Sequence, residues 1–556
     1  MTELLVVIVT GIVVIAAASL VGPRLRIASP LVLVAIGVAA SFLPVFGAAH
    51  IEPEWIIEGV LPPLLYSSAV SMPAMNFRRE FGAIGGLSVL LVVASALLLG
   101  LFFMLVIPDL GFAWGVALGA IISPTDAVAT SIVKQAPVSK RVVAMLDGES
   151  LLNDATALVL LRTAIVATAA AFSFWGAVGT FAYSVVVALI IGGLVGWANL
   201  VVRKRVTDPA VNTVISFAVP FLASVPAEHL GASGLVAAVV AGLVTGFRAP
   251  RDLSPQNRLS DSQNWRTVEL VLEGAVFLTM GVQIKSIVEN VERDHAGVGT
   301  AVLIAAGALV VTVLVRAAYI TPLLGVLAAS SRHSERMQTR VQGMQERMTT
   351  PEGKQSTFGE VRSRRRPASE RELDRFALRI TRLLADIEYF LRAPLGWREG
   401  TAVVWAGMRG AVTVAAAQTL PEDTPQRSVL VLIAFAVAAL SLLVQGGTIG
   451  PLLRLISPRT DPAATDEQTG TELTRIMEML RTAAQTVPEP PHPSGDPTPE
   501  GFLTAKRHRL EVIAAQRSAL LDARDNGTFD AEVLEDALAN LDATEIAIAM
   551  RGKFAE

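Results

Sequence analysis

Residues 148–160 read Gly-Glu-Ser-Leu-Leu-Asn-Asp-Ala-Thr-Ala-Leu-Val-Leu and decide the fold, because they put two carboxylates and an amide inside an apolar stretch. On a helix, Glu149 and Asn153 are four residues apart, and so are Ser150 and Asp154. The two pairs therefore lie on neighbouring strips of one helix face. In a lipid bilayer such a face is costly unless it meets partners, a water-filled cavity or an ion. The stretch thus predicts a functional site within a membrane.

The composition agrees with a membrane protein. Of the 556 residues, 52% are hydrophobic, which leaves too little polar surface for a water-soluble protein. The chain has no cysteine, so disulfides and thiolate metal sites are excluded. None of the six histidines falls in the middle of a span, and no His or Lys base lies near the depth of Ser150. These absences argue against a zinc transporter and against an enzyme. We expect no catalytic residues and no cofactor.

Apolar segments recur along the first 456 residues, and each is long enough, near 20 residues, to cross about 30 Å of hydrocarbon. We expect an all-α polytopic membrane protein with thirteen transmembrane helices. Every second connection is basic, from Arg24 and Arg26 to Arg248 and Arg251, whereas the intervening ones are acidic or neutral. By the positive-inside rule, the N-terminus is outside and the C-terminus is cytoplasmic.

Two segments depart from the membrane pattern. Residues 330–395 form a cytoplasmic insertion between the eleventh and twelfth spans of the 1–456 transmembrane domain. We interpret it as a solvated loop; the alternative is that its arginines, among them 364–366, contact anionic lipid. Residues 457–556 form a small α-helical cytoplasmic tail with a regulatory or structural role. Its helices are expected near 470–485, 501–524 and 529–549, with Asp525-Asn526-Gly527 as a turn.

Two spans are predicted to be broken. Pro124 interrupts the fifth span and frees backbone carbonyls beside Thr125 and Asp126, which are oxygen groups suited to alkali cations. In the twelfth span, glycines flank Arg409, which would offset the dipoles of half-helices that meet there. Interrupted helices at corresponding places in two halves indicate two inverted six-helix repeats with two crossing broken helices, joined by the seventh span.

Two further charged residues lie within spans. Arg316 is mid-way along the eleventh span and needs a carboxylate partner, for which Glu149 is the candidate. Glu273 is several residues inside the tenth span. It belongs either to the cavity or to a helix–helix pair, and both readings stay open.

These residues resemble the monovalent cation–proton antiporter family, in the branch of bacterial NhaP and the animal sodium–proton exchangers. The resemblance covers about residues 1–456. The stretches that carry it are Leu61-Pro62-Pro63, Pro124-Thr125-Asp126, Gly148 to Asp154, Glu273 to Gly281, Arg316 and Gly407 to Ala411. One departure is Tyr66-Ser67 after the Pro-Pro pair, where some relatives have an acidic residue, so no acidic ligand is expected from that span.

The resemblance implies a homodimer and assigns the polar residues. Asp154 would carry the cation and the proton, with Na⁺ held at Asp154, Asp126 and Thr125. The other residues fall into an ion-binding group, Asn153 and Ser150, and a structural or charge-compensating group, Glu149, Arg316, Arg409 and Glu273.

The expected function is exchange of Na⁺, and also Li⁺, for H⁺ across the plasma membrane by alternating access, serving pH homeostasis and sodium tolerance. Asn153 stands where electrogenic relatives carry a second Asp, so exchange is expected to be electroneutral, 1:1. One alternative is K⁺/H⁺ exchange on the same fold, and a more remote one is a cation channel or a membrane sensor. The expected partners are monovalent cations, protons, the lipid bilayer and a second copy of the chain, with no nucleic acid.

Overall fold

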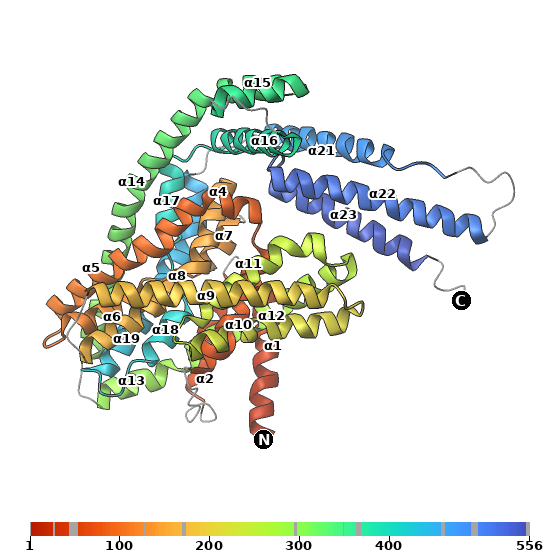
Figure 1. The fold of residues 1–556 in the computed structure, drawn as a ribbon. Coiled ribbons are helices and arrows are strands. Elements are labelled where there is room, and N and C mark those ends of the chain that lie inside the picture. Colours follow the sequence, from red (N-terminus) through yellow and green to blue (C-terminus); the bar gives the residue numbers. More distant parts are fainter. Residues whose placement is uncertain are drawn as a thin grey trace. The chain divides into compact units, whose positions relative to one another are not determined.

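The computed structural model describes residues 2–25, 28–43, 54–126, 128–134, 136, 138–169, 174–293, 297–348, 350–362, 369–456, 462–490 and 499–551. All regular structure in these ranges is helical (Figure 1). The chain forms two compact units. The first comprises Met1–Asp252, Ser260–Leu324 and Trp397–Ser457, and the second comprises Leu253–Leu259, Gly325–Gly396 and Pro458–Glu556.

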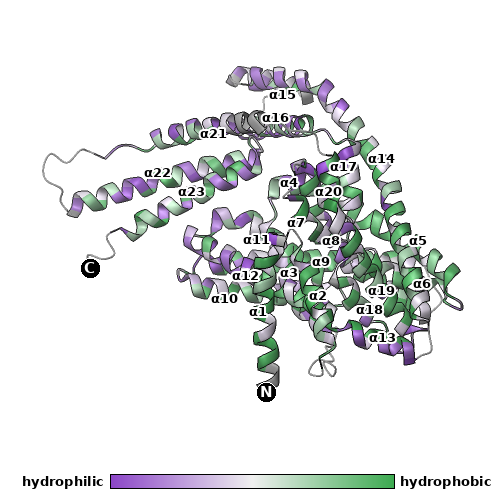
Figure 2. Cartoon of the chain, turned by 180° about the vertical axis from the view of Figure 1, so that it is seen from behind, coloured by the Kyte–Doolittle hydropathy of each residue, from purple (hydrophilic) through white to green (hydrophobic). Residues whose placement is uncertain are grey.

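The first unit contains the apolar helices, which Figure 2 colours mostly as hydrophobic. Its first half consists of α1 (Thr2–Leu25), α2 (Ser29–Ser41), η2 (Trp55–Val60), α3 (Leu61–Ser71), α4 (Ala74–Gly85), η3 (Gly86–Leu91), α5 (Val92–Val106), α6 (Phe112–Ile122), α7 (Val128–Lys134) and α8 (Lys140–Ala169). It continues with α9 (Phe174–Arg203), α10 (Pro209–His229), α11 (Gly234–Asp252), α12 (Pro255–Val282), α13 (Ile284–Arg293), α14 (Val298–Arg347), α17 (Trp397–Trp405), α18 (Ala411–Gln418), α19 (Arg427–Ser441), η4 (Leu442–Gly446) and α20 (Gly447–Ile456).

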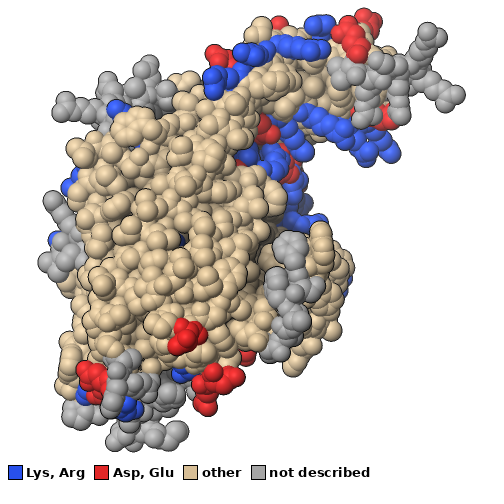
Figure 3. All heavy atoms as spheres, turned by 90° about the vertical axis from the view of Figure 1, so that its left-hand side faces the viewer, with Lys and Arg blue, Asp and Glu red and all other residues tan. Residues whose placement is uncertain are grey.

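In the described part of the chain, nine helices are long and apolar enough to cross a membrane. The other four predicted spans fall on the short helix α2, the η2–α3 segment and the interrupted pairs α6–α7 and α17–α18. The count of thirteen therefore stays a prediction, but a multi-pass membrane protein is established. Figure 3 shows a broad face with few charged side chains, as a lipid-facing surface requires.

Several charges are buried between these helices in pairs that were not predicted. Arg203, at the end of α9, is fully buried and forms an ion pair of 2.9 Å with Asp261 of α12. Its Nε also donates to Asn212 of α10 over 2.8 Å. Arg141 of α8 and Glu80 of α4 form a second buried pair of 2.6 Å. Buried charges in a protein interior are tolerated only when they are paired in this way.

The second unit is built from amphipathic helices. They are α15 (Pro351–Arg362), α16 (Glu370–Arg392), α21 (Pro462–Gln485), α22 (Pro499–Asn526) and α23 (Ala531–Met550), together with the end of α14. Leu520 of α22 and Leu534 of α23 are buried in a shared apolar core with Ile476 of α21. Gly527 has φ of +72°, a conformation that glycine adopts without strain, and it ends α22 at the predicted turn. The arginines 364–366 lie outside the described residues.

Candidate functional site

Both predicted helix interruptions are present. Helix α6 ends at Ile122 and α7 begins at Val128, while α17 ends at Trp405 and α18 begins at Ala411. The Ser123 hydroxyl donates to the carbonyl of Ala120 over 3.0 Å, so it satisfies the carbonyl that a helix broken at a proline leaves open. The fifth and twelfth predicted spans therefore each contain a short irregular segment.

The two irregular segments bind each other. The backbone N–H of Asp126 donates to the carbonyl of Met408 over 2.8 Å. The buried Arg409 Nε donates to the carbonyl of Ile122 over 2.9 Å. That carbonyl belongs to the last turn of α6, where unpaired carbonyls and the helix dipole favour a positive charge. The guanidinium of Arg409 thus lies at the carbonyl end of the α6 half-helix.

The crossing leaves no room for a side chain at Gly410. A Cβ atom added there would lie 1.4 Å from the Oδ2 atom of Asp126, far inside van der Waals contact. Asp126 Oδ1 accepts a hydrogen bond of 3.0 Å from the backbone N–H of Val128, at the start of α7. The position of the Asp126 carboxylate therefore depends on glycine at position 410.

A chain of hydrogen bonds links the opening motif to the broken fifth span. The guanidinium of Arg316 in α14 donates to both carboxylate oxygens of Glu149. The distance from Arg316 Nη2 to Glu149 Oε2 is 2.7 Å. Thr125 Oγ1 donates to Glu149 over 3.2 Å and accepts from Asn153 Nδ2 over 2.7 Å. Both ends of the ion pair are buried. Glu149 is thus fully engaged with Arg316 and Thr125.

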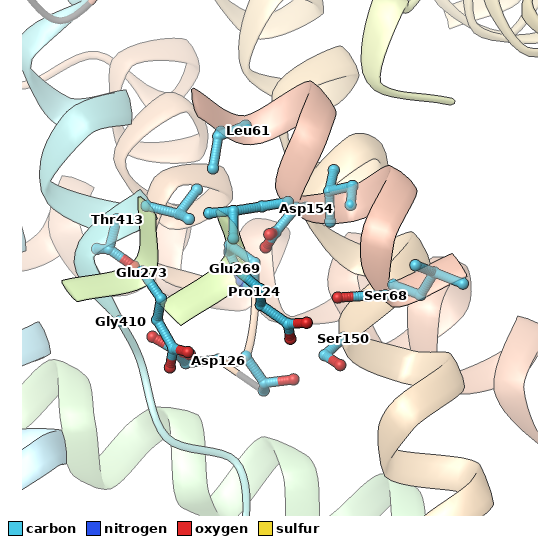
Figure 4. A pocket seen from close by; sticks show the side chains of 15 residues that line it. Leu61, Ser68, Pro124, Asp126, Ser150, Asp154, Glu269, Glu273, Gly410 and Thr413 are labelled. Atoms are coloured by element: carbon cyan, nitrogen blue, oxygen red, sulfur yellow. The ribbon is translucent and has the colours of Figure 1, made fainter. Parts of the chain in front are cut away.

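Next to this chain lies a cavity of about 100 Å³. Its carboxylates come from three separate places in the chain, and Figure 4 shows them around the same space: Asp126, Asp154, Glu269 and Glu273. Its hydroxyl groups are those of Ser68, Thr125, Ser150 and Thr413. A small cavity with hydroxyl and carboxylate oxygens is suited to a dehydrated alkali cation.

Asp154 differs from the other charged groups of α8. Its side chain is 9% exposed and lines the cavity. No hydrogen bond or ion pair joins it to another described residue, whereas Glu149 and Arg141 on the same helix are both paired. A buried carboxylate without a protein partner needs a proton or a cation to neutralise it.

The predicted ion-binding residues line the cavity in the structure, with the exception of Asn153. Asp154, Asp126, Thr125, Ser150 and Glu273 all line the cavity. Asn153 does not; it is completely buried behind the wall and holds Thr125 through its side-chain amide, so it acts on the cavity indirectly.

Glu269 and Ser68 line the cavity but were not predicted. Glu269 stands four residues before Glu273 on α12, and this spacing could have identified it. Ser68 carried no sequence signal.

The side-chain donor atoms that line the cavity are all oxygens. Across the described residues, no three His, Cys, Asp or Glu side chains come close enough together to hold a metal ion. Oxygen groups of this kind fit a monovalent alkali cation.

The model of the transmembrane sodium/hydrogen exchanger family matches residues 9–342 and 376–455. The chain belongs to this family. The resemblance drawn from the sequence motifs is thereby confirmed. The family is one of cation/proton antiporters, which are transporters.

Individual relatives agree. An uncharacterized Na⁺/H⁺ exchanger of Mycobacterium tuberculosis is 26% identical over 98% of this chain and 96% of its own length. The Na⁺/H⁺ antiporter ApNhaP of Aphanothece halophytica is 24% identical over 84% of this chain and 76% of its own. The solved structure of the sodium proton antiporter MjNhaP1 of Methanocaldococcus jannaschii aligns with a TM-score of 0.54 at 16% identity. It covers 82% of this chain and 100% of that one. This last likeness shows the shared fold.

Replacing Gly410 with alanine should abolish cation/proton exchange, because the new Cβ overlaps the Asp126 carboxylate and forces the two irregular segments apart. The measurement is cation-driven proton flux in proteoliposomes. Gly447→Ala is the matched control, since a Cβ at that position meets no atom within 4 Å. Normal flux in Gly410→Ala would contradict the described crossing.

Proposed function

We propose that the exchanger carries Na⁺ in one direction and H⁺ in the other across the plasma membrane by alternating access, with Asp154 accepting either ion but not both. The observation that carries the proposal is the state of the Asp154 carboxylate, which is buried, faces a cavity and lacks a protein partner. In a membrane such a group exists as the protonated acid or as a carboxylate bound to a cation. Competition for one carboxylate couples the two fluxes without a separate gate.

The neighbouring residues then have distinct roles. Asp126, Thr125 and Ser150 supply further oxygen atoms to the bound Na⁺, and Asn153 keeps Thr125 in place. Glu149, Arg316 and Arg409 compensate charge and hold the helix crossing together. We further propose the thirteen-span arrangement with inverted repeats, the homodimer, and a role in pH homeostasis and sodium tolerance, on the strength of the family.

The cavity is proposed to open towards the cytoplasm. Helix α8 begins at Lys140, in a connection that the positive-inside rule assigns to the cytoplasm. Ser150 lies one turn nearer that end than Asp154, and both line the cavity. This placement supports an inward-facing state, with the N-terminus outside and the C-terminus inside.

A second candidate keeps the mechanism and changes the cation. A Bacillus subtilis relative, 29% identical over 48% of this chain and 41% of its own length, is named a sodium, potassium, lithium and rubidium/H⁺ antiporter. Oxygen ligands accept K⁺ as well as Na⁺, so K⁺/H⁺ exchange on the same residues is the alternative. A channel or a sensor, by contrast, would move no protons in exchange for cations.

Proteoliposomes containing the exchanger should show proton flux when Na⁺, K⁺ or Li⁺ is added separately, with Na⁺ the most effective. Asp154→Asn should reduce this flux to that of empty vesicles, because the amide cannot bind and release a proton and brings no negative charge to the cation. Asp423→Asn, in an exposed loop, is the matched control. Full activity in Asp154→Asn would exclude Asp154 as the carrier, and flux with K⁺ alone would favour the second candidate.

We also propose that exchange is electroneutral, 1:1. Asn153 contributes an amide beside Asp154, so only one of these two adjacent side chains can carry a charge. An imposed membrane potential should therefore leave the Na⁺-driven proton flux unchanged when the ion gradients are held constant. A flux that rises with the imposed voltage would overturn the 1:1 stoichiometry.

A further inference from the structure

Glu269 is a cavity carboxylate to which the function proposed above assigns no role. It lies on α12, lines the cavity and is partly exposed, whereas Asp154 is buried. Figure 4 places it in the same space as Asp154 and Ser68. A partly exposed carboxylate beside a buried one suggests a path by which a cation reaches the deeper group.

Helices α8 and α12 each bring polar residues to the cavity. Ser150 precedes Asp154 by four residues on α8, and Glu269 precedes Glu273 by four residues on α12. Four residues of helix rise about 6 Å. Ser150 therefore lies about 6 Å from Asp154 along α8, and Glu269 lies about 6 Å from Glu273 along α12, so each helix lines the cavity at two depths.

The charged groups around Asp154 differ from those around Glu269. The charged neighbour of Asp154 is Asp126, whereas those of Glu269 are Lys134, Arg266 and Asp147. Lys134 and Asp147 form an ion pair of 3.0 Å, and their side chains are 53% and 28% exposed. Because this pair neutralises itself and water reaches it, Glu269 lies at the solvent side of the cavity.

Helix α3 holds Glu269 at that position. Ser67 Oγ donates to Glu269 Oε2 over 3.3 Å, and Ser68 lines the cavity next to it. Helix α3 itself brings no carboxylate to the wall, since Tyr66, Ser67 and Ser68 follow its Pro-Pro pair. The carboxylate on this side of the cavity is thus delivered by α12 and positioned by an α3 hydroxyl.

We propose that Glu269 receives the monovalent alkali cation at the mouth of the cavity before the cation reaches Asp154. The inference rests on the proposed exchange function. A negative charge on the wall of the same cavity as the transport site attracts cations to the cavity and repels anions. Glu269 is not the group at which cation and proton compete, so its loss weakens cation capture without stopping turnover.

Glu269→Gln tests this role. The amide oxygen still accepts the Ser67 hydrogen bond while the charge is removed, so a purely structural role would be preserved. With cation capture lost, the KM for Na⁺ should rise about five- to tenfold, with the maximal rate nearly unchanged. The readout is the initial rate of proton flux in proteoliposomes as a function of Na⁺ concentration.

Two variants complete the experiment. Glu269→Asp keeps the charge and should retain a KM close to that of the unaltered protein, so it separates the loss of charge from the change of side chain. Glu289→Gln is the matched control, because Glu289 lies on the surface of α13 and pairs with Lys285 and Arg293. Its KM should not change.

An unchanged KM in Glu269→Gln would overturn the inference, and so would a KM in Glu269→Asp that rises five- to tenfold although the charge is kept. A loss of maximal rate without a change in KM would also contradict it, because that result would place Glu269 in the turnover step. If the unaltered exchanger itself moved no protons in response to any cation, the proposed function would fail instead, and the two failures are thereby distinguishable.

Discussion

The buried pair between Arg316 and Glu149 is the interaction on which the site depends. Neither charge could exist alone at this depth, since removing one partner of a buried pair commonly costs about 3–5 kcal/mol. The pair joins α14 to α8, and Thr125 extends it to the interrupted fifth span. It also occupies Glu149 completely, so that Asp154, five residues further along α8, is left as the carboxylate of this motif that faces the cavity without a protein partner.

The same principle explains the surrounding charges. Arg409 meets carbonyls at the end of α6, Arg203 meets Asp261, and Arg141 meets Glu80. Each of these cations has a fixed partner and therefore stabilises helix packing rather than moving ions. The cavity, in contrast, collects carboxylates and hydroxyls without a lining lysine or arginine among its described residues. A transported cation can supply the positive charge that these lining residues do not provide.

Much of this organisation could be predicted from the sequence, for identifiable reasons. Pro124 and the glycines around Arg409 indicate broken helices, because proline lacks a backbone donor and glycine weakens a helix whatever surrounds them. The Arg316–Glu149 contact followed from the need of a buried guanidinium for a carboxylate. The contact of Asn153 with Thr125, the Arg203–Asp261 pair and the place of Glu269 on the cavity wall could not be predicted. These contacts depend on which face each helix turns towards its neighbours, and a single sequence does not show this. Helix length alone also undercounts the spans, because an interrupted span such as α17–α18 consists of two short helices.

The central claim is that Na⁺ and a proton compete for the Asp154 carboxylate. The most direct test adds Na⁺ to the purified, weakly buffered exchanger in detergent and measures the protons released with a pH-sensitive dye. The account predicts saturable release of about one proton per bound cation, as expected when a cation displaces a proton from its ligand, and no release from Asp154→Asn. Na⁺ binding without proton release, or undiminished release from Asp154→Asn, would contradict it.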